Sequence, residues 1–164
     1  MKNIFNILKD KNLTISFAES MTGGYLSSKL TKINGASKVF KGSIIAYSNE
    51  IKIKLLNVSK DTIEKHSVVS SQVANEMAYG LKDVIDSDIY VAITGNAGPT
   101  LEANTNKLIC YITVLYKEEV INHIEIFNTN KRFSNIKRVE KVVKNIVYNV
   151  ILWYNYKGIE MTLS

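Results

Sequence analysis

Hydrophobic residues recur along this chain with two different periods, which predict alternating helices and strands. A spacing of three and four residues is typical of an amphipathic helix, whereas short alternating or continuous apolar runs favour strands. The first pattern predicts helices over residues 4–8, 25–33, 49–56, 72–84 and 134–154, with a short helical turn opening at Ser59. The second predicts strands over residues 13–18, 40–48, 88–94, 108–116 and 120–127. Ser70 or Ser71 is expected to cap the fourth helix, and Gly158 to end the last one.

The order of these elements indicates an α/β fold. Helices separate the first three strands, which favours parallel pairing between them. Residues 117–119 join the last two strands as a hairpin, which adds antiparallel neighbours. Residues 88–94 form a near-continuous apolar run, typical of a strand covered on both faces. The pattern predicts a mixed sheet between helical layers, in a single domain over residues 1–164.

Composition narrows the class of protein. Hydrophobic residues make up 46% of the chain and charged residues 22%, which are ordinary globular values. They exclude a disordered chain, a collagen-like chain and a disulfide scaffold. No apolar run reaches the roughly 18 residues of a membrane span, and the first residues lack the apolar block of a signal peptide. With one cysteine, Cys110, we expect a cytoplasmic protein without a membrane partner.

The net charge is +6 and is unevenly spread. Residues 131–145 hold six basic side chains and one acidic side chain. A solvated helix face explains this run better than a nucleic-acid partner, which we do not expect, although a phosphate or nucleic-acid ligand stays an alternative.

Three predicted strands end in loops rich in hydroxyl groups and small residues. The loops hold Ser20, Thr22, Gly23 and Gly24; Tyr47, Asn49 and the nearby Lys52; and Thr94 and Gly95. The carboxyl ends of parallel strands meet at one edge of a sheet, where ligands of open α/β sheets bind. Each loop alone has a structural explanation, namely a helix cap, surface charge or packing. Together they predict one crevice for an anionic or carbonyl-bearing small molecule.

Five short motifs follow one another along the chain. They are AESMTGG at 18–24, GAS at 35–37, YSNEIK at 47–52, VVS at 68–70 and TGNAGP at 94–99. Their order and spacing resemble the CinA C-terminal domain family, whose enzymes are the nicotinamide-nucleotide amidases. The resemblance implies a three-layer α/β/α sandwich on a mixed, mostly parallel sheet of about five to six strands. It also implies a homodimer that needs no metal or cofactor.

The resemblance further implies hydrolysis of the carboxamide of nicotinamide mononucleotide, which gives nicotinic acid mononucleotide and ammonia. The family's proposed nucleophilic serine falls on Ser20, and its tyrosine and lysine fall on Tyr47 and Lys52. The expected substrate-binding residues are Thr22, Gly23, Gly24, Ser37, Asn49, Thr94, Gly95 and Arg132.

The chemistry of the residues agrees with these roles. A serine needs a base within hydrogen-bond reach, and neither His66 nor His123 is a persuasive one. A lysine can serve if burial or nearby positive charge lowers its pKa from roughly 10.4 toward 7. Backbone N–H groups near Gly23 and Gly24 are expected to steady the oxyanion or to bind the phosphate.

Two departures from the family pattern keep alternatives open. The loop over residues 100–106 contains no glycine where the family has a glycine-rich loop, and Asn96 replaces the usual isoleucine. Side chains in such a loop obstruct the approach of backbone amides to a phosphate. The alternatives are a catalytically degenerate module that binds a nucleotide or a protein, and a basic protein associated with nucleic acid.

Overall fold

The computed structural model describes residues 1–101 and 106–162, the last eight of them as backbone only. The chain forms α1 (Lys2–Asp10), β1 (Ile15–Glu19), α2 (Tyr25–Thr31), a 3₁₀ turn (Ala36–Lys38), β2 (Phe40–Ile45), α3 (Asn49–Leu56), α4 (Lys60–His66), α5 (Ser71–Val84), β3 (Ile89–Asn96), β4 (Ile109–Tyr116), β5 (Glu119–Ile126) and α6 (Arg132–Thr162). The order agrees with the alternation predicted from the sequence, and Ser70 is the residue that caps α5.

One five-stranded sheet organises the molecule, with the strand order β2-β1-β3-β4-β5. Strand β1 pairs in parallel with both β2 and β3, whereas β4 runs antiparallel to β3 and β5 antiparallel to β4. Four of the five strands therefore run in one direction. This confirms the expected mixed, mostly parallel sheet.

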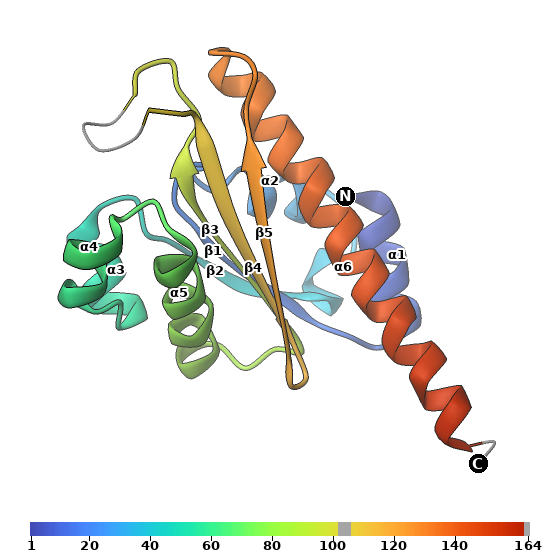
Figure 1. Ribbon diagram of the computed structural model, residues 1–164. Coiled ribbons are helices and arrows are strands. Elements are labelled where there is room, and N and C mark those ends of the chain that lie inside the picture. The colour runs from blue at the N-terminus through green and yellow to red at the C-terminus, as the bar shows by residue number, and fades with distance from the viewer. Residues whose placement is uncertain (102–105, 163–164) are drawn as a thin grey trace.

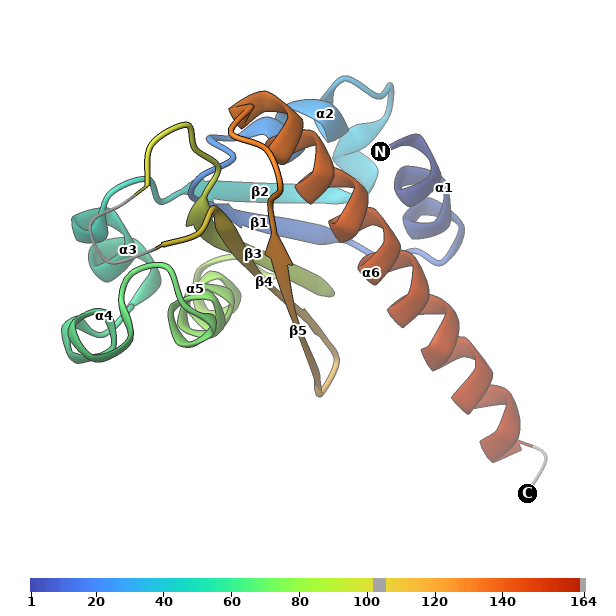
Figure 2. The same ribbon diagram turned by 45° about the horizontal axis from the view of Figure 1, so that its top comes forward.

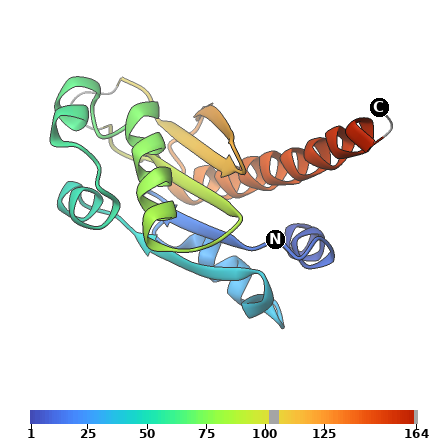
Figure 3. The ribbon, with the colours of Figure 1, turned by 90° about the horizontal axis from the view of Figure 1, so that it is seen from below.

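Helices cover both faces of the sheet and make three layers (Figures 1 and 2). The first face packs against α1, α2 and α6, and the second against α3, α4 and α5. Seen from below, α3, α4 and α5 lie on one side of the sheet, and α1 and α6 lie on the other (Figure 3). None of the described helices is long and apolar enough to cross a membrane.

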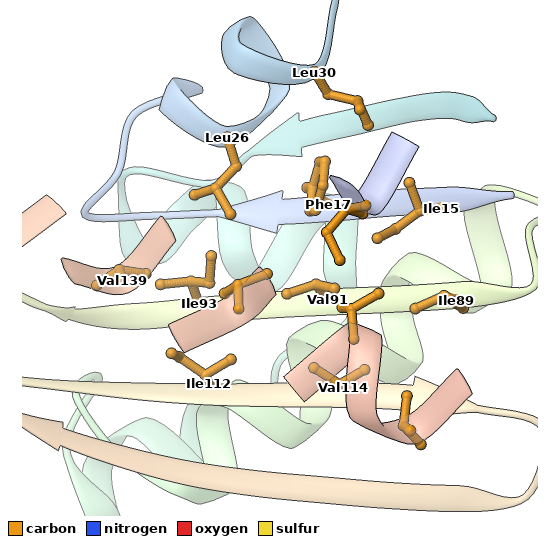
Figure 4. Packing of buried hydrophobic residues seen from close by; sticks show 14 of the residues in the cluster. Ile15, Phe17, Leu26, Leu30, Ile89, Val91, Ile93, Ile112, Val114 and Val139 are labelled. Carbon is orange, nitrogen blue, oxygen red and sulfur yellow. The ribbon is translucent and has the colours of Figure 1, made fainter. Parts of the chain in front are cut away.

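The larger core lies on the first face, where large side chains from three strands meet α2 and α6 (Figure 4). Alternate residues of a strand point to opposite faces, so Phe17 enters this core while its neighbour Ala18 faces α5. The labelled core members are Ile15, Phe17, Leu26, Leu30, Ile89, Val91, Ile93, Ile112, Val114 and Val139.

Small residues on the second face bring α3 and α5 close together. Gly80 lies on α5 where a Cβ atom would come within 1.9 Å of the Leu56 carbonyl oxygen at the end of α3. This contact fixes α3 against the body of the protein, and α3 carries Lys52.

Two predicted boundaries are wrong. The second strand ends at Ile45 rather than at residue 48, because Ser48 accepts a hydrogen bond from Ile51 N and begins α3. The last helix starts at Arg132 and continues past Gly158 to Thr162. A glycine inside a helix costs about 1 kcal/mol relative to alanine, but it ends a helix only where the backbone turns left-handed.

Candidate active site

Ser20 and Lys52 lie together although 32 positions separate them in the chain. Ser20 follows the last residue of β1, and its backbone N–H donates to Ile93 O of the neighbouring strand β3. Lys52 lies in the second turn of α3 and is only 2% exposed. Its Nζ lies 3.0 Å from Ser20 Oγ and 2.9 Å from the carbonyl oxygen of Ala46, and donates to both. A buried hydroxyl is thus in direct contact with a buried amine.

These two side chains line a crevice at the carboxyl ends of β1 and β3. A cavity of about 210 Å³ is lined by Ser20, Tyr47, Asn49, Lys52, Val68, Val69, Thr94 and Gly95. A cavity of about 90 Å³ is lined by Ser20, Met21, Tyr47, Gly95, Asn96 and Arg132. Ser20, Tyr47 and Gly95 line both cavities, so Ser20 lies where the two compartments meet. The structure therefore brings the three predicted loops to one place.

Arg132 spans the mouth of the smaller compartment. Its Nη1 donates to Gly98 O at 3.0 Å, and its Nη2 donates to Met21 O at 3.0 Å and to the Tyr47 hydroxyl at 3.3 Å. The Tyr47 side chain is 64% exposed, so it stands at the rim rather than in the core. The guanidinium adds a fixed positive charge beside Ser20, which suits an anionic ligand.

Thr94 lines the crevice, but its hydroxyl serves another part of the protein. The side chain is 1% exposed, and Oγ1 donates to the carbonyl oxygen of Val68 at 2.9 Å. Thr94 therefore fixes the segment that carries Val68 and Val69, the apolar part of the crevice lining. This bond occupies its hydroxyl hydrogen, and a role of Thr94 in substrate binding stays a prediction.

Gly95 leaves the space that joins the two compartments. A Cβ atom there would come within 2.5 Å of Ile109 O and 2.7 Å of the Met21 sulfur. Any side chain at this position would have to displace β4 or Met21.

In the turn after Ser20, one of the amides expected to face the ligand makes a hydrogen bond within the turn instead. Gly23 N donates to Ser20 O within the turn, and the two amides at the start of α2 donate to the carboxylate of Glu19. This buried carboxylate also accepts from the Ser27 hydroxyl at 2.6 Å. In the sequence Glu19 stands out only as part of the AESMTGG motif, and the fold of the turn is what brings its carboxylate to the start of α2, where the helix dipole favours a negative charge.

Three predicted ligand residues in this turn lie outside the crevice lining. Thr22 is 5% exposed, and its hydroxyl makes no hydrogen bond to any described residue. Gly23 and Gly24 adopt the left-handed conformation that turns the chain into α2, with φ of 58° and 90°. They shape the backbone rather than line either compartment.

Ser37 lies at the amino-terminal ends of the parallel strands β1 and β2, whereas Ser20 lies at their carboxyl ends. It precedes β2, whose first residue Phe40 pairs with Ile15 at the start of β1, whereas Ser20 follows the end of β1. Its side chain is exposed. Within this chain Ser37 therefore lies away from the crevice, because parallel strands place the two serines at opposite ends, and its role in substrate binding stays a prediction.

Neither histidine lines the crevice. His66 is the exposed last residue of α4. His123 lies on β5, with Nε2 3.1 Å from Glu125 Oε2, and Arg138 of α6 also donates to the Glu125 carboxylate. Burial opposes ionisation of Glu125, but these two hydrogen bonds and the charges behind them outweigh it and lower its pKa. The cluster ties β5 to α6.

The described part of the chain contains no group of three histidine, cysteine or acidic residues that could hold a metal ion.

The loop that departs from the family pattern is described only at its two ends, and residues 102–105 lie outside the described residues. At its start, Asn96 Oδ1 accepts from Gly98 N and Asn96 Nδ2 donates to Thr100 O, both at 2.8 Å. Asn96 thus holds the backbone of this turn with its own side chain.

Comparisons with known proteins give a consistent result. The family model described as the CinA C-terminal domain matches residues 1–150. A CinA-like protein of Petrotoga mobilis is 55% identical over 98 residues, which cover 60% of this chain and 24% of that protein. A CinA-like protein of Prochlorococcus marinus is 41% identical over 140 residues, which cover 85% of this chain and 30% of that protein. The chain thus spans less than a third of the length of these curated relatives.

A solved structure shows the same fold. The competence damage-inducible protein A of Klebsiella pneumoniae superposes with a TM-score of 0.85 and covers 93% of this chain and 95% of its own. The two sequences are 22% identical, so the likeness establishes the three-layer architecture.

Proposed function

This chain belongs to the CinA C-terminal domain family, and from that premise we propose that it is an amidohydrolase acting on nicotinamide mononucleotide. The products are nicotinic acid mononucleotide and ammonia. The observation that carries the proposal is the 3.0 Å contact between Ser20 Oγ and Lys52 Nζ at the floor of the crevice. A hydroxyl beside a buried amine is the arrangement of a serine nucleophile with a lysine base.

Lys52 is placed to accept the proton of Ser20, because its amine lies 3.0 Å from Ser20 Oγ. Its side chain is almost fully buried, and removal from water penalises a charged amine. The Ala46 carbonyl accepts one N–H of the amine at 2.9 Å. That bond holds the amine beside Ser20 Oγ, where a proton can pass between the two atoms.

The reaction proceeds through an ester on Ser20. The Ser20 oxygen bonds to the carboxamide carbon while its proton passes to Lys52 Nζ, which gives a tetrahedral intermediate. The C–N bond then breaks, Lys52 returns the proton to the departing nitrogen, and ammonia leaves. Water next adds to the ester carbon and gives a proton to Lys52. Cleavage of the C–O bond and return of that proton restore the Ser20 hydroxyl and release the acid.

The two compartments fit the two parts of this substrate. Val68 and Val69 offer an apolar wall for the pyridine ring, with Asn49 on the same lining. Arg132 supplies the charge for the phosphate, since a guanidinium pairs phosphate oxygens with fixed geometry. Tyr47 stands between the two compartments and can hold a proton or pack on the ring.

Ammonia release with Ser20→Ala tests the proposal. We expect kcat to fall by at least about 10³-fold, while the Kd for the mononucleotide changes less than about threefold. Ser28→Ala, an exposed serine on α2, is the matched control and should keep wild-type activity. Turnover by Ser20→Ala within tenfold of wild type excludes the role of Ser20. Binding by wild type without ammonia release favours the nucleotide-binding module instead.

We also propose that two copies of the chain associate. Strand β5 is an edge strand, and Val120, Ile124 and Ile126 on one of its faces are 40%, 54% and 47% exposed. An uncovered apolar strand face is typical of an association surface. Sedimentation equilibrium should give twice the mass of one chain.

A further inference from the structure

We propose that Asn135 is a positioning residue that holds Arg132 at the crevice and thereby sets a preference for amides that carry a phosphate. The inference rests on the proposed amidase function and names the group that determines its selectivity. Asn135 lies one turn after Arg132 on α6 and is 1% exposed.

Asn135 ties together two separate segments of backbone. Its Nδ2 donates to Ala97 O at 2.9 Å, in the turn after β3, and to Thr129 O at 2.8 Å, in the segment that enters α6. Both hydrogens of the amide are thus used, each on a carbonyl oxygen. Aliphatic side chains dominate the buried face of α6, so a donor of this kind there has a specific task.

The segments that Asn135 joins are those that set the position of Arg132. Ala97 precedes Gly98, whose carbonyl oxygen accepts from Arg132 Nη1 at 3.0 Å. Thr129 begins the short approach to Arg132, and its hydroxyl accepts from Lys131 N at 3.2 Å. Asn135 therefore fixes both the backbone from which Arg132 projects and one carbonyl that its guanidinium binds.

This anchoring leaves part of the guanidinium for a ligand. Among the described residues, the hydrogen bonds of Arg132 are those to Gly98, Met21 and Tyr47, and a guanidinium carries five N–H donors. Arg132 lines the smaller compartment beside Ser20, so we expect its other donors to serve a ligand there. A phosphate bound there gains from the fork geometry only if the guanidinium is held in place.

Replacing Asn135 with leucine keeps a similar volume and removes the donors. Two carbonyl groups in a buried region then lose their partner, so we expect the 97–98 turn and the start of α6 to separate. Ser20 and Lys52 are placed by β1, β3 and α3, through the bonds that join Ser20 to Ile93 and Lys52 to Ala46. The substitution should affect recognition of the phosphate more than the chemical step.

The test compares nicotinamide mononucleotide with nicotinamide riboside, which is the same amide without the phosphate. For Asn135→Leu we expect kcat/KM on the mononucleotide to fall at least tenfold, mostly through KM, and kcat/KM on the riboside to change less than about twofold. Arg132→Ala should reproduce this selectivity change. Asn145→Leu, an exposed position on α6, is the matched control and should leave both substrates unaffected.

Equal losses on both substrates, or no loss on either, would overturn the inference. Calorimetric Kd values for the two compounds provide a readout that does not need turnover, so an inactive wild type overturns the amidase proposal while the binding ratio still decides the role of Asn135. If Asn135→Leu fails to fold, Asn135→Ala removes the same two donors with a smaller side chain. The same selectivity loss is required of that variant, and equal affinities in it and in wild type overturn the inference.

Discussion

Replacing Lys52 with methionine should separate catalysis from stability. Methionine fills a similar volume at this 2% exposed position and cannot accept a proton. We expect ammonia release to fall at least about 10³-fold, equivalent to about 4 kcal/mol of transition-state stabilisation. The exposed neighbour Lys54 on α3 provides the matched control, Lys54→Met, which should retain wild-type activity.

The effect of this substitution on the fold should be much smaller. The variant loses the hydrogen bonds to Ser20 Oγ and Ala46 O, each of which contributes about 0.5–1.5 kcal/mol net. It also removes the cost of burying a polar amine, which is about 1–3 kcal/mol. These opposing contributions leave a change of less than about 2 kcal/mol in the free energy of unfolding, or less than about 8 °C in Tm. Activity within tenfold of wild type in a folded Lys52→Met variant would refute the assignment of Lys52 as the base.

Two further substitutions test the framework around the site. Gly95→Ala places a methyl group 2.5 Å from Ile109 O. We expect the free energy of unfolding to fall by at least about 2 kcal/mol and Tm to fall by about 4–8 °C. An unchanged melting curve would contradict this packing. The pKa of Glu125 is lower in the folded state than its unfolded value of about 4.3. The ionised carboxylate therefore stabilises the folded protein at pH values above the unfolded pKa. This stabilisation is lost as the pH falls through the folded pKa. Denaturant titrations should therefore show wild type more stable than Glu125→Gln at pH 7, with the gap closing below about pH 4; a constant gap contradicts the linkage.

Much of the fold follows from local patterns in the sequence. The apolar run over 88–94 predicts a central strand, and β3 is the middle strand of the five, with helices on both faces of the sheet. The hydroxyl of Ser70 predicts the start of α5 because a side-chain oxygen satisfies the first free amide of a helix. Parallel pairing of β1, β2 and β3 then brings the ends of three loops to one edge, which is why Ser20, Lys52 and Thr94 could be grouped before the structure was known.

The sequence-based expectations differ from the structure where the position of a residue depends on segments distant in the chain. Ser37 belongs to a motif that precedes its strand, whereas the crevice forms where strands end, so its place follows from strand direction rather than from its residue type. Gly23 is in the expected turn, but its amide donates to Ser20 O within that turn. Asn135 has no local signal, because its two acceptors lie 38 and 6 residues away in the chain.

The contact between Ser20 and Lys52 depends on packing that neither residue provides. Lys52 reaches the crevice because Ser48 starts α3 four residues earlier and because the missing side chain of Gly80 lets Leu56 approach α5. Ser20 is held by a β1 terminus whose two neighbours supply Ala46 and Ile93 for backbone hydrogen bonds to Glu19 and Ser20. The catalytic proposal is therefore sensitive to residues far from the reacting atoms. A side chain at position 80 would collide with backbone and push α3 outward, so it would lengthen the distance from Nζ to Oγ without altering any group that touches the substrate.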